Sequence, residues 1–362
     1  MPSNAHYPIA ATVYRGDAVE NTHAAHVAIV DASGQLLAGF GSPSRITLAR
    51  SAAKPAQALA VIETGALERF GFDEPDLALM CASHSSEPRH IERALAMLAK
   101  ADAQESDLRC GGHPAISDAV WKDWIKRDFV PTAACSNCSG KHAGMLAGAQ
   151  ALGATLRDYQ LPAHPLQQHV KHVVADVCDL PDDGVAWSID GCNLPTPAFP
   201  LDRLARLFAK IADAGDRTDP ATQTVSSEVT PRVAALGRIH RAMTGYPELV
   251  AGEGRFCTTL MRAFDGALVG KVGAEASYAI GVRASAQTER LGAKGALGIA
   301  VKVEDGNATI LYAIVATLLD QLGIGTVEQR AKLDAFRTPP MRNTMGVDTG
   351  RLAIDIPLTD RR

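Results

Sequence analysis

Regions of strand-like sequence lie near both ends of the chain, and this arrangement constrains the fold more than any other feature. Residues 26–40 predict a β-hairpin, because two β-compatible runs flank the turn-forming residues 31–34. Further strands are predicted near the other end, at residues 266–272, 278–283 and 295–303. One sheet can include both regions only if distant parts of the chain come together, with helices packed on its faces. We therefore expect an α/β (α+β) fold, an αβα sandwich with a mixed or antiparallel central sheet.

No linker rich in Pro, Gly or Ser divides the chain, so residues 1–362 are expected to form a single domain. The sheet would come from roughly residues 7–50 and 255–310, and helices would fill roughly residues 51–250. The individual elements predicted are a helix at 51–64 ended by Gly65, a short apolar strand at 77–82, a helix from Pro88 to residue 99 capped by Ser86, a helix at 141–151, a strand at 185–189 and a closing helix at 308–322.

The composition is that of a soluble globular protein. Apolar residues make up 46% and charged residues 21% of the 362. The net charge of -4 argues against a nucleic-acid-binding surface, which needs a basic excess. No apolar run of about 18 residues is present, and residues 1–11 lack the apolar segment of a signal peptide, so no membrane partner is expected. The seven cysteines are an odd number in a long chain, which favours a reducing, cytoplasmic compartment over a disulfide framework.

Ser51 and Lys54 form an S-x-x-K motif at the start of a predicted helix. The spacing puts both side chains on one face, and Pro55 requires a position near the helix N-terminus. The helix dipole there favours an activated hydroxyl and a neutral amine. Serine β-lactamases combine this motif with a K-T-G lysine on a strand, and Lys271 begins a similar K-x-G element. The alternatives are a serine helix cap and two solvated lysines.

Cysteines with metal-ligand spacing lie in the central region. Cys135 and Cys138 form a C-x-x-C pair, which Cys192 and His142 could complete as a tetrahedral zinc site. A redox pair would need a thioredoxin-like context, which is absent, and buried free cysteines are the alternative. Lys141 begins a predicted helix whose N-terminus is suited to bind an anion.

Ser83 and His84 follow a predicted strand and precede a helix, a position at which α/β folds present functional groups. No aspartate lies at a spacing that indicates a Ser-His-Asp triad. We therefore interpret His84 as a loop histidine, and Ser83, Ser85 and Ser86 as either functional groups or helix caps.

Six strings spread over nearly the whole chain are long and uncommon. They are RSAAKP at residues 50–55, CASHSSE at 81–87, CSGKH at 138–142, IDGC at 189–192, VAGEGRFC at 250–257 and GKVGAE at 270–275. In this order they resemble the L-asparaginase II family, the rhizobial-type L-asparaginases.

The resemblance implies an enzyme that hydrolyses L-asparagine to L-aspartate and ammonia, with a fold similar to that of serine β-lactamases and glutaminases. It also implies a homodimer and two Ser–Lys tandems, Ser51 with Lys54 and Ser83 with Lys271. The helix-dipole position favours Ser51 as the nucleophile and Ser83 as a relay or second nucleophile, although the sequence does not decide between them.

The resemblance further implies one zinc ion per chain, bound by Cys138, Lys141 and Cys192. Asp190 or a water molecule would complete the coordination, and the spacing of the cysteines keeps Cys135 as an alternative ligand. A lysine ligand is unusual because its amine must be neutral.

Arg50, Glu275 and His142 are candidates to bind the substrate, because a zwitterionic amino acid needs complementary polar partners. Three other functions stay open. Another serine amidohydrolase, a glutaminase or a β-lactam hydrolase, would prefer glutamine or penicillin. A zinc-dependent hydrolase would use the metal to activate water and would lose all activity on chelation. An amino-acid-binding protein without enzymatic activity would bind the amino acid and release no ammonia.

Overall fold

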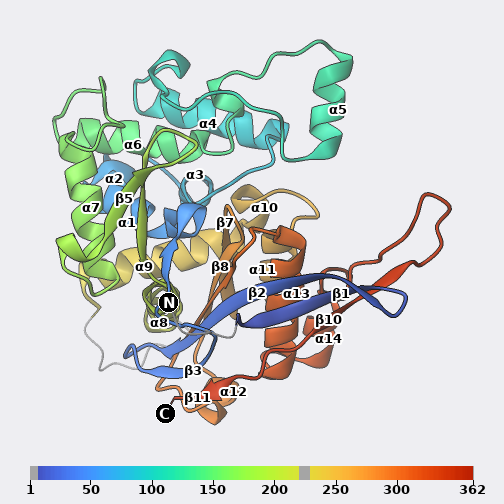
Figure 1. The fold of residues 1–362 in the computed structure, drawn as a ribbon. Helices are drawn as coiled ribbons and strands as arrows, with labels where there is room; N and C mark the ends of the chain where they lie inside the picture. The colour runs from blue at the N-terminus through green and yellow to red at the C-terminus, as the bar shows by residue number, and fades with distance from the viewer. Residues whose placement is uncertain (1–6, 220–228, 362) are drawn as a thin grey trace, which may run out of the picture. The chain divides into compact units, whose positions relative to one another are not determined.

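Strands from both ends of the chain form one sheet, in which the blue N-terminal β1 (Ile9–Arg15) lies beside the red C-terminal β10 (Gly350–Ile354) in Figure 1. The computed structural model describes residues 7–219 and 229–361. The other strands of this sheet are β2 (Ala18–Asp31), β3 (Leu36–Phe40), β7 (Leu268–Gly273), β8 (Ser277–Val282), β9 (Leu297–Val303) and β11 (Thr359–Asp360). Their order is β10-β1-β2-β9-β8-β7, and β3 pairs with both β2 and β11. All these pairings are antiparallel.

Along the chain, most of the helices come between the N-terminal and the C-terminal strands of this sheet. The α-helices are α1 (Lys54–Glu63), α2 (Ala66–Phe70), α3 (Glu74–Met80), α4 (Pro88–Lys100), α5 (Asp118–Lys126), α6 (Ser139–Ala151), α7 (Pro165–Val177), α8 (Leu201–Arg217), α9 (Pro231–Gly245), α10 (Pro247–Val250), α11 (Phe256–Phe264), α12 (Ala286–Arg290), α13 (Ala308–Gln321), α14 (Val327–Ala331) and α15 (Asp334–Arg337). The short 3-10 helices are η1 (Arg50–Ala53), η2 (Glu105–Asp107), η3 (Ala133–Cys135) and η4 (Asp182–Gly184), and the remaining strands are β4 (Ile46–Leu48), β5 (Ala186–Ile189) and β6 (Pro195–Pro200). Within the described residues, no helix combines the length and the apolar character that crossing a membrane requires.

The chain folds as two units. The sheet unit consists of the chain up to Thr47, Phe199–Asp213 and the chain from Ala263 onward. The helical unit consists of Leu48–Ala198 and Ala214–Arg262. Part of the predicted helical region, residues 220–228, lies outside the described residues. The expectation that residues 1–362 form a single domain stays a prediction.

A helix packs on each face of the large sheet. A Cβ atom on Gly281 of β8 would lie 2.1 Å from the backbone oxygen of Phe208, so glycine is needed for the close approach of α8. Tyr278 is three positions away on the same strand and therefore faces the opposite side. Its ring meets Tyr312 of α13 edge-on, with the centroids 6.3 Å apart. The sheet unit is therefore an antiparallel sheet between helices, as an α+β sandwich requires.

The predicted hairpin and the predicted union of distant strands are confirmed. Ala28 of β2 pairs with Gly39 of β3 on one side and with Ala300 of β9 on the other. The two C-terminal strands β10 and β11 were not predicted. β10 is five residues long and mostly half-buried, so it carries no apolar alternation that would indicate a strand.

The predicted strand at residues 77–82 is wrong, because most of these residues form the end of α3. The helix begins with a capping box, in which Asp73 Oδ1 accepts from the Asp76 N–H at 2.9 Å. Pro75 lies in the first turn, where its missing N–H is tolerated. A short apolar run does not distinguish a buried strand from a buried helix, and the upstream start signal decides here.

The predicted cap at Ser86 is also wrong. The N-cap of α4 is Glu87, whose N–H donates to His90 Nδ1 at 3.0 Å. Ser86 has a φ of 59°, and its hydroxyl donates instead to the Cys135 oxygen at 2.7 Å. The other central predictions are confirmed to within a few residues: 51–64 corresponds to η1 and α1, 141–151 to α6, 185–189 to β5 and 308–322 to α13.

Candidate active site

Lys54 is a fully buried amine at the start of α1. The turn η1 leads directly into this helix, and Pro55 occupies the first helical turn. Lys54 is 0% exposed, and its Nζ lies 3.2 Å from Ser83 Oγ and 3.1 Å from Cys138 Sγ. It also contacts the backbone oxygen of Ala82. The amine therefore joins the loop after α3 to the start of α6, all within the helical unit.

Ser51 lies in η1, just before Lys54 in the chain, and is half-buried. Within the part of the chain that the structure describes, its hydroxyl makes no hydrogen bond. The sequence paired Lys54 with Ser51, whereas the hydrogen bond in the structure joins Lys54 to Ser83.

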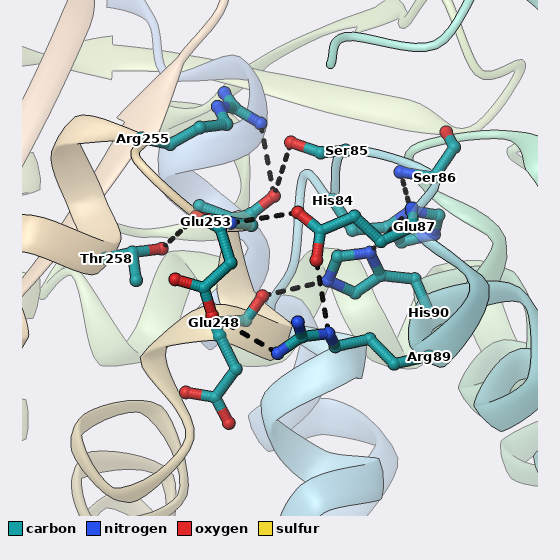
Figure 2. Close-up of polar contacts among 12 residues, drawn as sticks. His84, Ser85, Ser86, Glu87, Arg89, His90, Glu248, Glu253, Arg255 and Thr258 are labelled. Atoms are coloured by element: carbon teal, nitrogen blue, oxygen red, sulfur yellow. Dashed lines mark hydrogen bonds and ion pairs between the residues drawn. The ribbon is translucent and has the colours of Figure 1, made fainter. Parts of the chain in front are cut away.

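His84, next to Ser83, is a buried neutral donor. Its Nδ1 accepts from the Ser86 N–H at 3.2 Å, so its proton lies on Nε2, 2.9 Å from Ser139 Oγ. Burial, together with nearby positive groups led by His90, holds the pKa of His84 well below its ordinary value. The imidazole rings of His84 and His90, both labelled in Figure 2, are stacked with their centroids 4.9 Å apart. Because Nδ1 is already an acceptor and Nε2 a donor, His84 is not arranged as a base for Ser83.

Cys138, Lys141 and Cys192 form a buried cluster next to Lys54. Cys138 is the N-cap of α6 and Lys141 lies in the first turn, so one helix holds both. Lys141 Nζ donates to Cys192 Sγ at 3.1 Å. A hydrogen bond from the Cys138 thiol, aided by Lys141, lowers the pKa of Cys192 to about 5. The same bond, with burial, raises the pKa of Cys138 to about 12. Cys192 is therefore a thiolate at neutral pH and Cys138 a thiol.

Lys141 responds to the same cluster. Burial alone would lower its pKa, but the charge on Cys192 outweighs burial and raises the pKa above its ordinary value. Lys141 and Cys192 are therefore an ammonium–thiolate pair, and a metal that bound Lys141 would have to displace its proton.

Asp190 and Arg50 form an ion pair at the edge of this cluster. Arg50 Nε donates to Asp190 Oδ1 at 2.6 Å, and the Gly191 N–H donates to the same oxygen at 2.9 Å. Burial would raise the pKa of Asp190, but Lys141 and Arg50 together lower it. The other carboxylate oxygen lies 3.7 Å from Cys192 Sγ. Asp190 therefore orients the Arg50 guanidinium through a charged hydrogen bond.

The donor set fits a zinc ion if Lys141 is counted among the ligands. Two sulfurs and one amine converge, and all three are soft or borderline donors that suit zinc. Among residues 7–219 and 229–361, no three His, Cys, Asp or Glu side chains gather closely enough to hold a metal. A site built from Cys138 and Cys192 therefore needs the lysine amine as its third ligand.

Cys135 lies apart from this donor set in its contacts. It packs against Ala115 and Trp124 in a small hydrophobic cluster, and its sulfur is 3.7 Å from Thr132 Oγ1. The two cysteines of the C-x-x-C pair lie in different elements, because the turn η3 ends at Cys135 and Cys138 is the N-cap of α6.

His142 is buried on α6 and holds its neutral form. Tyr159 Oη accepts from the Arg109 N–H at 3.0 Å and lies 2.6 Å from His142 Nδ1, to which it donates. The imidazole proton is therefore on Nε2, which makes no hydrogen bond of normal geometry within the described residues and lies near the Cys192 backbone. Burial, with Lys141, lowers the pKa of His142 to about 3. Tyr159 was not predicted, because no motif includes it.

Lys271 and Glu275 belong to the sheet unit. Lys271 is 1% exposed on β7, as the K-x-G motif predicts, and its Nζ donates to the Val272 oxygen at 2.7 Å. Glu275 is exposed in the turn between β7 and β8, with a φ of 56°. Its backbone oxygen accepts from Lys302 Nζ at 2.7 Å, an interaction that holds the turn.

Arg255 is the other site residue that sequence reasoning missed. Its Nη1 donates to the backbone oxygen of Ser83 at 2.6 Å. The string VAGEGRFC, residues 250–257, was noticed as a whole, but the string alone does not indicate which of its side chains contacts the serine loop.

A sequence model of the L-asparaginase II family matches residues 11–354, nearly the whole chain. A search of curated proteins found no match.

Proposed function

The chain belongs to the L-asparaginase II family, and on this premise we propose that it hydrolyses L-asparagine to L-aspartate and ammonia by Ser–Lys nucleophilic catalysis. The observation that carries the proposal is the contact of 3.2 Å between Lys54 Nζ and Ser83 Oγ in a buried site. A serine hydroxyl is a weak nucleophile, and an adjacent buried amine is one of the few groups that activates it.

Lys54 Nζ lies within hydrogen-bond distance of three partners, the Ala82 oxygen, Cys138 Sγ and Ser83 Oγ. A lysine that has released its proton has a lone pair, which can take the proton of a hydroxyl that it contacts. Lys54 would then accept the Ser83 proton during attack, and we propose Ser83 as the serine that it activates. No base within the described residues is hydrogen-bonded to the hydroxyl of Ser51, which the sequence favoured, and Ser51 is proposed as the second serine.

The reaction is an acyl transfer. Ser83 Oγ attacks the side-chain amide carbon of asparagine, and Lys54 takes the hydroxyl proton. The C–N bond breaks, and the lysine ammonium returns the proton to the departing nitrogen, which leaves as ammonia. Water, deprotonated by the same amine, then attacks the ester carbon. The bond to Ser83 Oγ breaks, the amine returns the proton to this oxygen, and aspartate is released. Lys271 is proposed as a second catalytic lysine on the family resemblance and its K-x-G motif.

Substrate binding is proposed for three of the side chains. Arg50, oriented by Asp190, is suited to the α-carboxylate of asparagine. His142 Nε2–H is a buried donor available to a substrate oxygen. Glu275 is proposed as the partner of the α-ammonium on the family resemblance.

One zinc ion per chain is proposed at Cys138, Lys141 and Cys192, with a water molecule as the fourth ligand, because Asp190 does not complete a group of three metal-binding side chains with the two cysteines among the described residues. When bound, the metal would supply a Lewis-acidic positive charge within the buried cluster. The buried cluster keeps Cys192 ionised before a metal binds. Cys138 and Lys141 would each release a proton when the metal binds.

The proposal also covers the type of fold, the compartment and the oligomeric state. The antiparallel sheet between α8 and α13 supports a fold of the serine β-lactamase type. A cytoplasmic homodimer is proposed on the family resemblance and on the seven cysteines, all of which are buried and none of which is in a disulfide.

The test measures ammonia release by the purified protein from L-asparagine and L-glutamine, and ring opening of a penicillin. We expect the highest kcat/KM with L-asparagine. Faster turnover of glutamine or penicillin would assign the site to another serine amidohydrolase. Complete loss on chelation, in a protein that keeps Ser83 and Lys54, would assign it to a zinc hydrolase, and asparagine binding without ammonia release to a binding protein.

A further inference from the structure

The loop that carries Ser83 is held from outside by a segment much later in the chain, residues 247–258. Residues 82–87 have no regular secondary structure of their own. The Ser83 N–H donates to the Val250 oxygen at 3.0 Å, and the Ser83 oxygen accepts from Arg255 Nη1 at 2.6 Å. Both backbone groups of the candidate nucleophile therefore bond to this one segment.

The same segment fits closely around the residues after Ser83. Figure 2 shows Ser85 and Arg255 directed at one backbone oxygen, that of Ala251, at 2.9 and 3.4 Å. Gly252 has a φ of +132°, and a Cβ atom there would lie 2.5 Å from Ser85 Oγ and 2.7 Å from Glu87 Oε1. Only glycine permits this approach, so the backbone at Gly252 packs directly against the side chains of Ser85 and Glu87.

Side chains on both sides hold the segment itself in place. Thr258 Oγ1 donates to the Gly252 oxygen at 2.6 Å, and His90 Nε2 donates to the Glu248 oxygen at 2.8 Å. The Glu253 N–H donates to Glu87 Oε1 at 2.9 Å (Figure 2). Arg255 therefore projects from a fixed frame and not from a freely moving loop.

The two peptide planes on either side of Ser83 fix the direction of its Cα–Cβ bond, from which the hydroxyl projects. In the first plane, the Ala82 oxygen contacts Lys54 Nζ and the Ser83 N–H is bonded to Val250. In the second plane, the Ser83 oxygen is bonded to Arg255 and the His84 N–H donates to the Asn137 oxygen at 3.2 Å. All four backbone groups are bonded, and the bond from the cationic Arg255 is of the stronger, charge-assisted kind.

We propose that Arg255 is a positioning residue that fixes the second peptide plane and so aims Ser83 Oγ at Lys54 Nζ. It acts through the backbone of Ser83 and does not need to touch the substrate. This inference rests on the proposed function, since it assigns Ser83 a reacting hydroxyl. A displacement of about 1 Å at a reacting atom can lower the rate by about 100-fold.

The test compares Arg255→Gln and Arg255→Lys with the matched control Arg262→Gln. Arg262 lies close by but donates to the exposed Glu253 and to Glu248, not to the Ser83 loop. We measure kcat and KM for L-asparagine, the Tm, and amide hydrogen exchange of the peptide that contains residues 82–87.

We expect Arg255→Gln to lower kcat by about 10- to 100-fold with KM changed less than about threefold, and to speed exchange at Ser83 and His84. Arg255→Lys should recover part of the lost kcat, because an ammonium can still donate to the Ser83 oxygen. Arg262→Gln should stay within about twofold of the wild type in kcat, because it leaves that bond intact.

Equal kcat values for Arg255→Gln and Arg262→Gln would overturn the proposal, and so would a kcat loss at Arg255 that lysine does not reduce. If Arg255→Gln fails to fold, hydrogen exchange of Arg255→Lys decides: at wild-type Tm, exchange at Ser83 and His84 that is faster than in Arg262→Gln supports positioning, and equal exchange overturns it. If the wild type releases no ammonia, the proposed function fails, while hydrogen exchange still tests positioning. Faster exchange at residues 82–87 in the Arg255 variants than in Arg262→Gln supports it, and equal exchange overturns it.

Discussion

Replacing Lys54 by Met removes the buried amine that contacts Ser83 and keeps a stem of similar volume. Loss of a general base costs a rate factor of about 10² to 10⁴, which is about 2.7 to 5.4 kcal/mol in barrier height. The change also leaves the Ala82 oxygen without its lysine donor, because Met cannot donate a hydrogen bond. An unsatisfied buried acceptor costs about 1 to 3 kcal/mol of folding free energy. We therefore expect a lower Tm together with the loss of turnover.

The assay is ammonia release from L-asparagine, with urea unfolding measured on the same preparation. The matched control is Lys126→Met, because Lys126 is an exposed lysine at the end of α5. We expect the control to keep wild-type kcat and stability. A Lys54→Met protein that is folded and retains activity within about tenfold of the wild type, a barrier change of about 1.4 kcal/mol, would refute Lys54 as the base.

The purified protein should carry about one zinc per chain. Cys192→Ser should lower the zinc content sharply, and the control Cys110→Ser should not. Elemental analysis that finds no metal would contradict the proposed zinc site. The free energy of unfolding should fall as the pH drops below about 6.5, because His84 binds a proton in the unfolded chain and stays neutral when folded. His84→Gln should reduce that slope by up to about 1.4 kcal/mol per pH unit, and an unchanged slope in urea titrations would contradict a neutral buried His84. Gly252→Ala should lower the Tm by several degrees, because the added Cβ would lie 2.5 Å from Ser85 Oγ and the φ of +132° is strained for alanine. The control Gly254→Ala should lower the Tm less, because its Cβ enters open space and only the backbone is strained.

Elements with a strong local pattern were predictable from the sequence. The hairpin of β2 and β3 has turn residues between two apolar runs, and α13 begins at the cap Asn307, whose side chain accepts from the Ile310 N–H at 3.1 Å. The run at 77–82 was misread, because a short apolar segment has the same composition in a buried helix and in a buried strand. β10 is too short and too evenly half-buried to be recognised.

The site was predictable as a set of residues but not as a set of contacts. Motifs and the family resemblance together indicated Lys54, Ser83, Cys138, Lys141 and Cys192, and the structure brings these side chains together. The partner of Lys54 was not predictable, because an S-x-x-K spacing favours the nearby serine and gives no information on a loop elsewhere in the chain. Arg255 acts through a backbone oxygen, and no residue pattern encodes such a contact.

The most direct test of the account is steady-state ammonia release from L-asparagine by the wild type, Ser83→Ala and Ser51→Ala, each checked for fold by circular dichroism. The account predicts that the wild type releases ammonia and that Ser83→Ala lowers kcat by at least about 10³-fold, as loss of a catalytic serine does. It predicts a smaller loss for Ser51→Ala, since the base Lys54 is hydrogen-bonded to Ser83. A folded Ser83→Ala protein with activity within about tenfold of the wild type, or a larger loss for Ser51→Ala than for Ser83→Ala, would contradict it.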